Sequence, residues 1–321
     1  IIASKLLDRF NEPLEVDGRE FVIGISIGAA IMPTHCSTVE ELVSKSDRAL
    51  YHAKRERNTF RLYHSEMEGT PGAAVELLDA LRIAVDQREF ALHYQPVVQA
   101  SGALVSIESL LRWSPPDNRR IAVESVVELA EAAGLIGRIG EWVLDTALAE
   151  TGGSIASGLI DYVSVNVSAR ELLSRDFLPR IRAAAGRHDV ALEKIHLEIK
   201  ESGILDSLPL GGARIMAGSG EGVRYIVDDF GRGYASLSYL HHLGVTSVKL
   251  DRELVRKVPH DDASRAFLKG LLVMTGDLGI DVIAKGVESE EQKSFLESIG
   301  CALFQGYLTG RPAPMDLLLP A

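Results

Sequence analysis

The sequence has few cysteines, few aromatic residues and no long apolar run. Only Cys36 and Cys301 are cysteines among the 321 residues, which excludes a disulfide framework and a cysteine-based zinc site. This scarcity is typical of proteins of the reducing cytoplasm, where we expect the chain to act. The longest apolar run, residues 21–32, is too short to span a bilayer, so we expect no membrane segment in this chain.

Basic residues are also in deficit, because 34 lysines and arginines stand against 45 acidic residues, for a formal net charge of −11. Such a surface repels phosphate backbones, and we therefore expect no nucleic-acid partner. Apolar residues make up 46% and charged residues 25%, which is typical of a globular protein. The chain begins without Met inside a helical pattern, so we expect further regions, including a sensory one that could tether the protein to a membrane, before residue 1.

A segment rich in Gly and Pro, residues 67–73, predicts a linker between two parts. Residues 1–66 have the pattern of a small α+β unit, with a helix over 2–10, a hairpin around Asp17-Gly18, one long strand over 21–32 and a short strand over 60–63. Thr38, followed by Glu41, predicts a capping box at the start of a helix that runs to about residue 54.

Residues 74–321 alternate strands and helices, which predicts an α/β fold of the (β/α)8 barrel type. We expect the eight strands near residues 90–98, 103–112, 162–168, 194–200, 223–228, 246–250, 281–285 and 302–306. Only residues 99–102 separate the first two strands, so they should form an antiparallel hairpin. The glycines of residues 208–222 predict a short or frayed helix before the fifth strand.

Polar side chains stand at the carboxyl ends of the predicted strands, where barrels carry their chemistry. They are Glu108, Asn166, Glu198, Asp228, Asp229, Lys249, Asp251, Lys285 and Gln305. Converging carboxylates repel each other unless a cation lies among them, and an all-oxygen ligand set favours Mg2+, Ca2+ or Mn2+. The alternative for any single acid is a solvated loop charge.

Several motifs resemble the EAL domain, a family of cyclic di-GMP phosphodiesterases and their inactive relatives. The segments lie in order over residues 74–316, and include Glu108-Ser-Leu-Leu-Arg-Trp113, Leu197-Glu-Ile-Lys-Glu-Ser202, Asp228-Asp-Phe-Gly231 and Gln305-Gly-Tyr-Leu308. Ser26-Ile-Gly28 and residues 46–54 resemble the back half of a GGDEF domain, which makes residues 1–66 a GGDEF-type remnant. The GGDEF signature itself is absent from the sequence, so we expect no diguanylate cyclase activity.

The resemblance implies a role for each rim residue. Glu108, Asn166, Glu198 and Asp228 would bind one Mg2+ or Mn2+, and Asp228 with Asp229 a second. Lys249 would contact the attacking water, Asp251 would orient it, and Glu201 would brace the loop after Asp228. Gln95, the backbone at Leu110, Arg112 and Gln305 would bind cyclic di-GMP. The family also implies a homodimer.

The chain departs from the family at Lys285, where the family has a glutamate of the second metal site. The ammonium group would occupy the second ion's place and pair with Asp229, or it would turn into solvent and leave Asp229 to the ion. At Lys200 the family usually has a threonine, and this lysine would lie either beside Glu198 and Glu201 or on the outer barrel face. In the loop after Asp228, Arg232 and Ala235 replace the family's usual threonine and serine.

Three functions remain open at this point. The first is a degenerate EAL domain that binds cyclic di-GMP with weak or no hydrolysis and retains one metal ion. The second is an active metal-dependent phosphodiesterase that hydrolyses cyclic di-GMP to pGpG. The third is a structural module that binds neither nucleotide nor metal.

Overall fold

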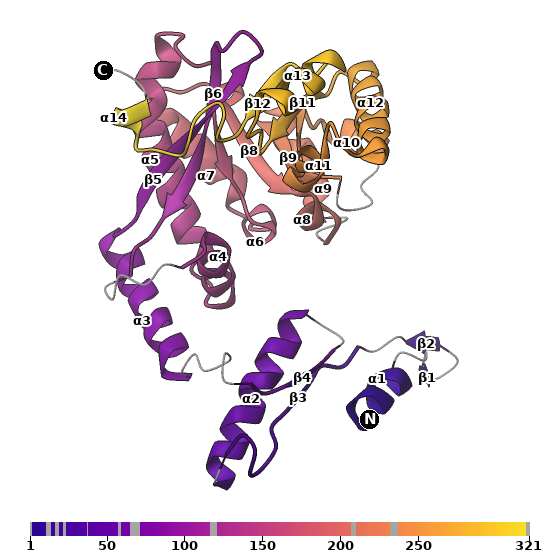
Figure 1. Cartoon of the computed structure of the whole chain (residues 1–321). Coiled ribbons are helices and arrows are strands. Elements are labelled where there is room, and N and C mark those ends of the chain that lie inside the picture. Colours follow the sequence, from indigo (N-terminus) through magenta and orange to yellow (C-terminus); the bar gives the residue numbers. More distant parts are fainter. Residues whose placement is uncertain are drawn as a thin grey trace. The chain divides into compact units, whose positions relative to one another are not determined.

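The computed structural model describes all residues except 1, 11–13, 17–18, 22–23, 37, 57–58, 65–70, 116–120, 207–209, 232–236 and 319–321. The chain forms two compact units, residues 1–79 and 80–321 (Figure 1). Helix α3 (Pro71–Gln87) runs across this division. Of the predicted linker, residues 67–70 lie outside the described residues and residues 71–73 are the start of α3.

The first unit is built from short elements. Strands β1 (Leu14–Val16) and β2 (Arg19–Phe21) pair antiparallel, whereas β3 (Ile27–Ala29) pairs parallel with β4 (Phe60–Leu62). The long strand predicted over residues 21–32 is therefore wrong, because this run contributes to two separate sheets. Helices α1 (Ile2–Phe10) and α2 (Val39–Glu56) complete the unit. Thr38 Oγ1 accepts from Glu41 N at 3.1 Å, as expected of an N-cap, and the Asp17-Gly18 turn lies outside the described residues.

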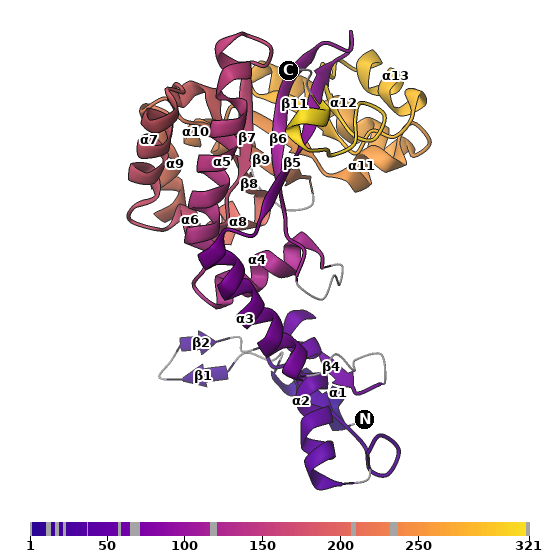
Figure 2. The same cartoon turned by 90° about the vertical axis from the view of Figure 1, so that its left-hand side faces the viewer.

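The second unit is a closed barrel of eight strands in the order β10-β11-β12-β5-β6-β7-β8-β9. The strands are β5 (Ala91–Gln99), β6 (Leu104–Arg112), β7 (Tyr162–Asn166), β8 (Ile195–Lys200), β9 (Arg224–Phe230), β10 (Ser247–Leu250), β11 (Asp281–Lys285) and β12 (Leu303–Gln305). All eight predicted strands are confirmed. The predicted hairpin is confirmed too, since β5 pairs antiparallel with β6 (Figure 2). Strand β5 also pairs antiparallel with β12, while the other neighbours in the barrel are parallel.

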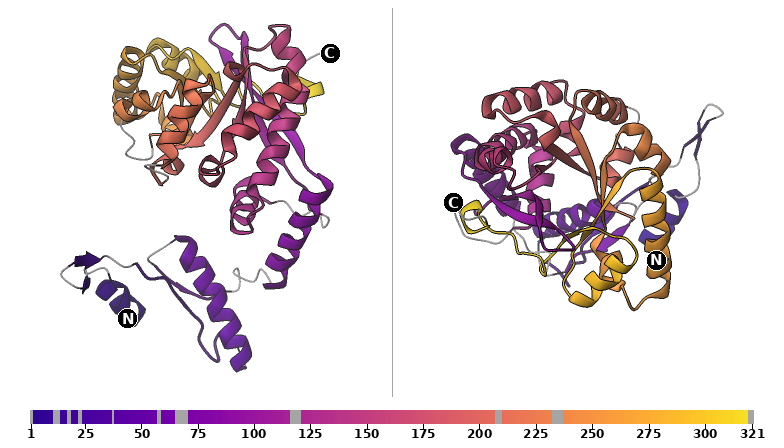
Figure 3. Two further views of the ribbon diagram at one scale, coloured as in Figure 1. Left: turned by 180° about the vertical axis from the view of Figure 1, so that it is seen from behind. Right: turned by 90° about the horizontal axis from the view of Figure 1, so that it is seen from above.

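Helices surround the barrel, as the view from above shows (Figure 3). They are α4 (Val123–Ala132), α5 (Ile136–Ala156), α6 (Ala169–Leu172), α7 (Phe177–His188), α8 (Glu201–Asp206), α9 (Leu210–Gly220), α10 (Leu237–Leu243), α11 (Arg252–Lys257), α12 (Asp262–Asp277), α13 (Glu290–Ser298) and α14 (Met315–Leu318). Among the described residues, none of the helices combines the length and the apolar character needed to cross a bilayer.

Helix α9 corrects the expectation of a short or frayed helix, because it is regular over 11 residues. One of its glycines has a packing role. A Cβ at Gly218 would lie 2.1 Å from the Tyr225 hydroxyl oxygen of β9, so only glycine allows the helix to approach the strand this closely. The cost of glycine in a helix is offset here by packing against the barrel.

The strands place the polar rim on top of an apolar interior. Val97, Val105, Tyr162, Ile226 and Ile283 form a buried cluster within the barrel. Because side chains alternate along a strand, Asp228 and Lys285 face the same side as the residues two positions before them, Ile226 and Ile283. The polar groups therefore meet inside the carboxyl end of the barrel.

Candidate functional site

The centre of the site is a lysine with no exposed surface. Lys249 Nζ lies 2.6 Å from Glu108 Oε2 and 2.5 Å from Glu198 Oε1, and both glutamates are buried. The three residues come from β10, β6 and β8, so the closed barrel is what brings them together. A buried ion group of this kind is stable only when every charge has a partner.

Two amide side chains complete the surroundings of Glu108. Asn166 Nδ2 donates to Glu108 Oε1 at 2.8 Å, and Gln305 Nε2 donates to Glu108 Oε2 at 2.7 Å. Both were predicted at the rim, and the structure shows that they orient the glutamate. Glu108 therefore accepts three hydrogen bonds, which favours its ionised form.

The two glutamates titrate differently. Burial alone would raise the pKa of Glu108, but the charge of Lys249, its hydrogen bond, the charge of Lys285 and the amide of Asn166 lower it to about 2. The pKa of Glu198 rises to about 7, because burial and the charge of Glu108 outweigh Lys249. Burial opposes the charge of Lys249, yet the Glu108 and Glu198 carboxylates raise its pKa well above the usual value. The lysine is therefore a permanent cation.

Lys285 lies between the two neighbouring aspartates of β9. Its Nζ is 2.8 Å and 2.7 Å from the Oδ1 and Oδ2 atoms of Asp228 and 3.1 Å from Asp229 Oδ1. Asp229 adopts a left-handed φ of 53°, and this turn lets successive carboxylates approach the same ammonium group. The predicted pairing with Asp229 is confirmed, and the alternative that Lys285 turns into solvent is wrong, since its side chain is only 27% exposed.

The other predicted residues surround this cluster. Glu201 Oε2 accepts from Gly231 N at 3.1 Å, as expected of a residue that braces the loop after Asp228; Arg232 and Ala235 of that loop lie outside the described residues. Asp251 is buried and caps α11 by accepting from Glu253 N at 2.9 Å. Lys200 is exposed at the end of β8, on the face that Glu198 shares.

The predicted ligand-binding residues lie at the same end of β5 and β6. Gln95 is the register partner of Glu108, and its Nε2 donates to Gly310 O at 3.1 Å. Arg112 is half-buried and its Nη1 donates to Leu111 O at 2.9 Å, while the half-buried Leu110 lies two residues before it. Sequence reasoning missed Gly310, and no local signal could have identified a contact to a residue so distant along the chain.

The acidic side chains of the rim outnumber its lysines. Four carboxylates share two ammonium groups, so each acid has a positive partner but the cluster keeps an excess of negative charge. The buried Glu198 Oε2 atom has no hydrogen-bond partner among the described residues, and it is available to a cation. Within the described part of the chain, no three His, Cys, Asp or Glu side chains are grouped closely enough to hold a metal ion, and Lys285 donates to both oxygens of Asp228.

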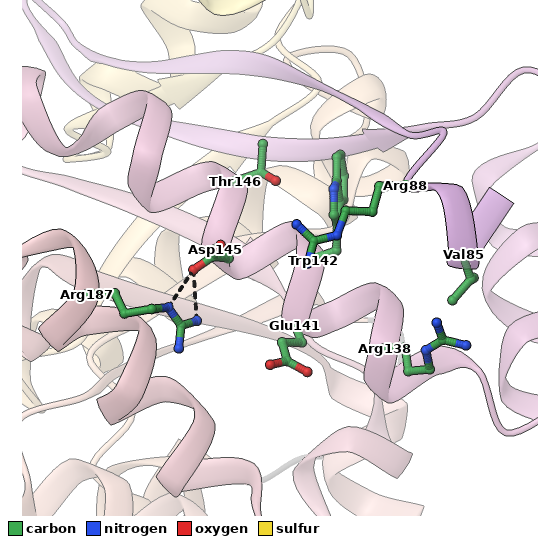
Figure 4. Close-up of a pocket in the computed structure, with 8 residues that line it drawn as sticks. All are labelled: Val85, Arg88, Arg138, Glu141, Trp142, Asp145, Thr146 and Arg187. Carbon is green, nitrogen blue, oxygen red and sulfur yellow. Dashed lines mark hydrogen bonds and ion pairs between the residues drawn. The ribbon is translucent and has the colours of Figure 1, made fainter.

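A separate pocket of about 320 Å3 lies outside the barrel (Figure 4). Its lining comes from the end of α3, from α5 and from Arg187 of α7, which pairs with Asp145 at 2.8 Å. None of the predicted rim residues lines it, so it is distinct from the rim.

Comparison with known proteins agrees with this geometry. The family model described as EAL domain matches residues 78–312, which is more than half of the chain. The chain belongs to the EAL domain family. The model described as diguanylate cyclase, GGDEF domain, matches residues 1–59.

Relatives support the same family. The bifunctional diguanylate cyclase/cyclic di-GMP phosphodiesterase MucR of Pseudomonas aeruginosa is 36% identical over 321 residues, which cover 99% of this chain and 47% of MucR. The cyclic di-GMP phosphodiesterase PdeR of Escherichia coli is 30% identical, with 98% of this chain and 48% of PdeR covered. The chain thus spans less than half the length of these relatives.

A solved structure shows the same fold. The PaMucR phosphodiesterase in its c-di-GMP complex superposes with a TM-score of 0.71 and 35% identity, over 76% of this chain and all of that chain. The predicted barrel and the predicted family are therefore confirmed.

Proposed function

We propose that this EAL domain is a cyclic di-GMP receptor that binds the dinucleotide with weak or no hydrolysis. The observation that carries the proposal is the position of Lys285, whose Nζ lies within 3.1 Å of three oxygens of Asp228 and Asp229. An ammonium group there takes the place of a divalent cation in a two-metal site. Two-metal hydrolysis needs both ions to stabilise the attacking and the leaving oxygen.

One Mg2+ or Mn2+ would be held by the remaining residues if their side chains drew together, because no three acids of the described residues are grouped closely enough for an ion. Glu108, Asn166, Glu198 and Asp228 offer the hard oxygen ligands that these ions prefer. When bound, the ion would polarise a phosphate oxygen and lower the pKa of a bound water. A second ion does not fit, because it would have to displace Lys285 from both aspartates.

The ligand itself is held by residues of the rim. Arg112 presents a planar fork of donors that suits a phosphate oxygen pair. Gln95, the backbone at Leu110 and Gln305 would add neutral hydrogen bonds, and Lys249, Asp251 and Glu201 would keep the cluster and its loop in place. The c-di-GMP complex of the MucR domain supports this assignment, since 35% of the residues are identical over the whole of that chain.

The alternative is an active phosphodiesterase that releases pGpG. The observation in its favour is that the first metal set, Lys249 and Asp251 all converge in the structure, with Lys249 fully buried between Glu108 and Glu198. The printed names of MucR and PdeR also include phosphodiesterase activity. Under this alternative, Lys285 moves aside when the second ion binds.

Other parts of the proposal concern partners. Residues 1–66 would be a GGDEF-type remnant without cyclase activity, residues 67–73 the linker and residues 74–321 the EAL domain. We place the domain in the cytoplasm. A homodimer would use α12, whose Phe267, Val273 and Met274 are 45%, 64% and 51% exposed. Phe267 also lies beside Gly231, next to the loop that the family uses for coupling.

The test combines calorimetry with chromatography of the nucleotide after incubation with Mn2+. The receptor proposal expects saturable binding heat and intact cyclic di-GMP recovered from the protein. Formation of pGpG that disappears in Glu108→Ala would establish the active enzyme instead. Absence of binding heat under every metal condition would overturn both and leave the structural module.

A further inference from the structure

Both tryptophans of the chain lie against one phenylalanine at the start of β5. The chain has two tryptophans, Trp113 and Trp142. The Phe90 ring centroid is 6.3 Å from that of Trp113 and 5.5 Å from that of Trp142, with interplanar angles of 52° and 51°. Tilted pairs at these distances contribute attraction beyond simple burial, so Phe90 is held against both indole rings. We call Phe90, Trp113 and Trp142 the Phe90 cluster.

Phe90 is fixed to the end of α3 by a tight turn. The helix ends at Gln87, Arg88 adopts a left-handed φ of 58°, and Glu89 N donates to Ala84 O at 2.9 Å. This arrangement is a Schellman motif, which fixes the conformation of the residues that directly follow the helix. Leu81 and Ala84 of α3 are fully buried, so packing anchors the end of the helix that leads into Phe90.

The same residues set the position of Arg112. Ala91, directly after Phe90, is the register partner of Arg112, and Trp113 directly follows Arg112. Trp113 is buried, so its contact with Phe90 cannot be replaced by solvent without loss. A shift at the end of α3 therefore reaches Arg112 both through the strand pairing and through the Phe90 cluster.

Trp142, on the side of the cluster opposite Trp113, borders a pocket into which its ring can move. Trp142 lies in the wall of the pocket of about 320 Å3, together with Val85 and Arg88 of the α3 end (Figure 4). An exposed ion pair, Arg138 Nη2 to Asp86 Oδ1 at 2.8 Å, joins α3 to α5 beside this pocket. Exposed pairs contribute little stability, so this connection can open without unfolding the barrel.

We propose that Phe90 is a positioning residue, which couples the end of α3 to Arg112 through the two tryptophans. The proposal rests on the cyclic di-GMP site proposed above. Ligand binding at Arg112 then shifts the Phe90 cluster, and a displacement of α3 changes the affinity for the ligand by the same factor, because coupling between two sites is reciprocal. Helix α3 is thereby the element through which a conformational change reaches the ligand site of the domain.

The test uses tryptophan fluorescence of the full chain, since every indole of the protein belongs to the cluster. Trp113→Phe leaves Trp142 as the reporter, and Trp142→Phe leaves Trp113. Each single-tryptophan variant is titrated with cyclic di-GMP while its indole is excited at the red edge of the absorption band. A titration with GMP controls for light absorbed by the nucleotide, and calorimetry is run in parallel. We expect both emissions to change with the calorimetric midpoint. A constant Trp142 emission at calorimetric saturation would overturn the proposal.

Substitution of Phe90 distinguishes positioning from mere stability. We expect Phe90→Leu to weaken ligand binding roughly three- to tenfold and to abolish the response of Trp142, while Phe90→Tyr restores both. The matched control is Phe177→Leu, which removes a buried ring of α7 that is not among the residues predicted at the rim. If Phe90→Leu and Phe177→Leu lower the melting temperature by the same amount and weaken ligand binding equally, Phe90 has only a structural role.

A ligand-free arm keeps this proposal separate from the proposed function. Asp86→Lys places two cations against each other and pushes the end of α3 away from α5. In the Trp142→Phe protein, this change should shift the emission of Trp113 without any nucleotide. Absence of binding heat with a shifted emission would refute the ligand assignment alone, and an unshifted emission would refute the coupling.

Discussion

Replacing Lys285 by glutamate should restore a second metal site, and the structure allows its size to be estimated. Two unit charges about 4 Å apart interact by about 4 kcal/mol at an effective dielectric near 20. The exchange changes the local charge by two units next to a divalent ion, and solvent reaches 27% of the Lys285 side chain. Because solvent screens most of this interaction, we expect about 3–5 kcal/mol in favour of the ion, or roughly a hundredfold to several-thousandfold tighter binding.

The assay is thermal unfolding with and without Mn2+, followed by chromatography for pGpG. Without metal, Lys285→Glu should melt lower than the parent protein, because a fifth carboxylate joins the rim and an ammonium is lost. With Mn2+ the order should reverse, since an ion at 100 times its dissociation constant adds about 2.7 kcal/mol. For a domain of this size, that corresponds to a rise of about 5–10 °C. Formation of pGpG should appear or increase in the same samples.

Two control variants test whether the added carboxylate at position 285, rather than a change of charge alone, tightens metal binding. Lys285→Met removes the positive charge without adding a ligand, so it should tighten metal binding less than the glutamate does. Lys269→Glu makes the same charge change at an exposed position of α12 and should leave metal binding unchanged. Equal Mn2+ shifts in Lys285→Glu and in the parent, with no gain in pGpG, would show that Lys285 does not limit the second site.

Three further predictions concern stability. Lys249→Met should lower the free energy of unfolding by about 3–5 kcal/mol in urea titrations, because two buried glutamates lose their cation; a loss below about 1 kcal/mol would contradict the buried ion group. Gly306→Ala should reduce the yield of folded protein, since its Cβ would lie 2.1 Å from Val287 O, a backbone atom that cannot move aside, and unchanged circular dichroism and melting would refute this. Burial lowers the pKa of His196 to about 3, so the folded state binds fewer protons than the unfolded state and stability should fall as the pH drops from 6.5 towards 3. His196→Gln should flatten this slope, and parallel slopes would rule out the histidine as its cause.

The barrel could be predicted from the sequence because its strands follow local rules. Buried parallel strands read as short apolar runs, and the four residues 99–102 allow only a hairpin. Prediction failed where long-range packing decided the structure. The run over residues 21–32 divides between two pairings, and α9 is regular despite its glycines because Gly218 packs against Tyr225.

The sequence predicted which residues lie at the site, but not which of them pair with each other by hydrogen bonds and ion pairs. The rule that strand ends carry chemistry brought Glu108, Glu198 and Lys249 to one rim before any contact was known. The sequence did not indicate that both oxygens of Asp228 are taken by Lys285, because a side chain's partner depends on the direction of the strand end and on its rotamer. The Phe90 cluster was missed for the same reason, since its rings come from three separate segments.

Under the receptor proposal, the rim also explains how the domain would keep its fold with one metal ion fewer. An ammonium group carries half the charge of a divalent ion and satisfies three carboxylate oxygens at 2.7–3.1 Å, so the aspartates remain paired without metal. A lysine is covalently attached, however, and cannot polarise a water as a metal ion does. Under the receptor proposal, a lysine in place of the family's glutamate would keep the electrostatic balance of the barrel and would remove the metal ion that activates water. Under this account, cyclic di-GMP binding should depend less on added Mg2+ in the parent protein than in Lys285→Glu, because the parent supplies one of its cations from its own chain.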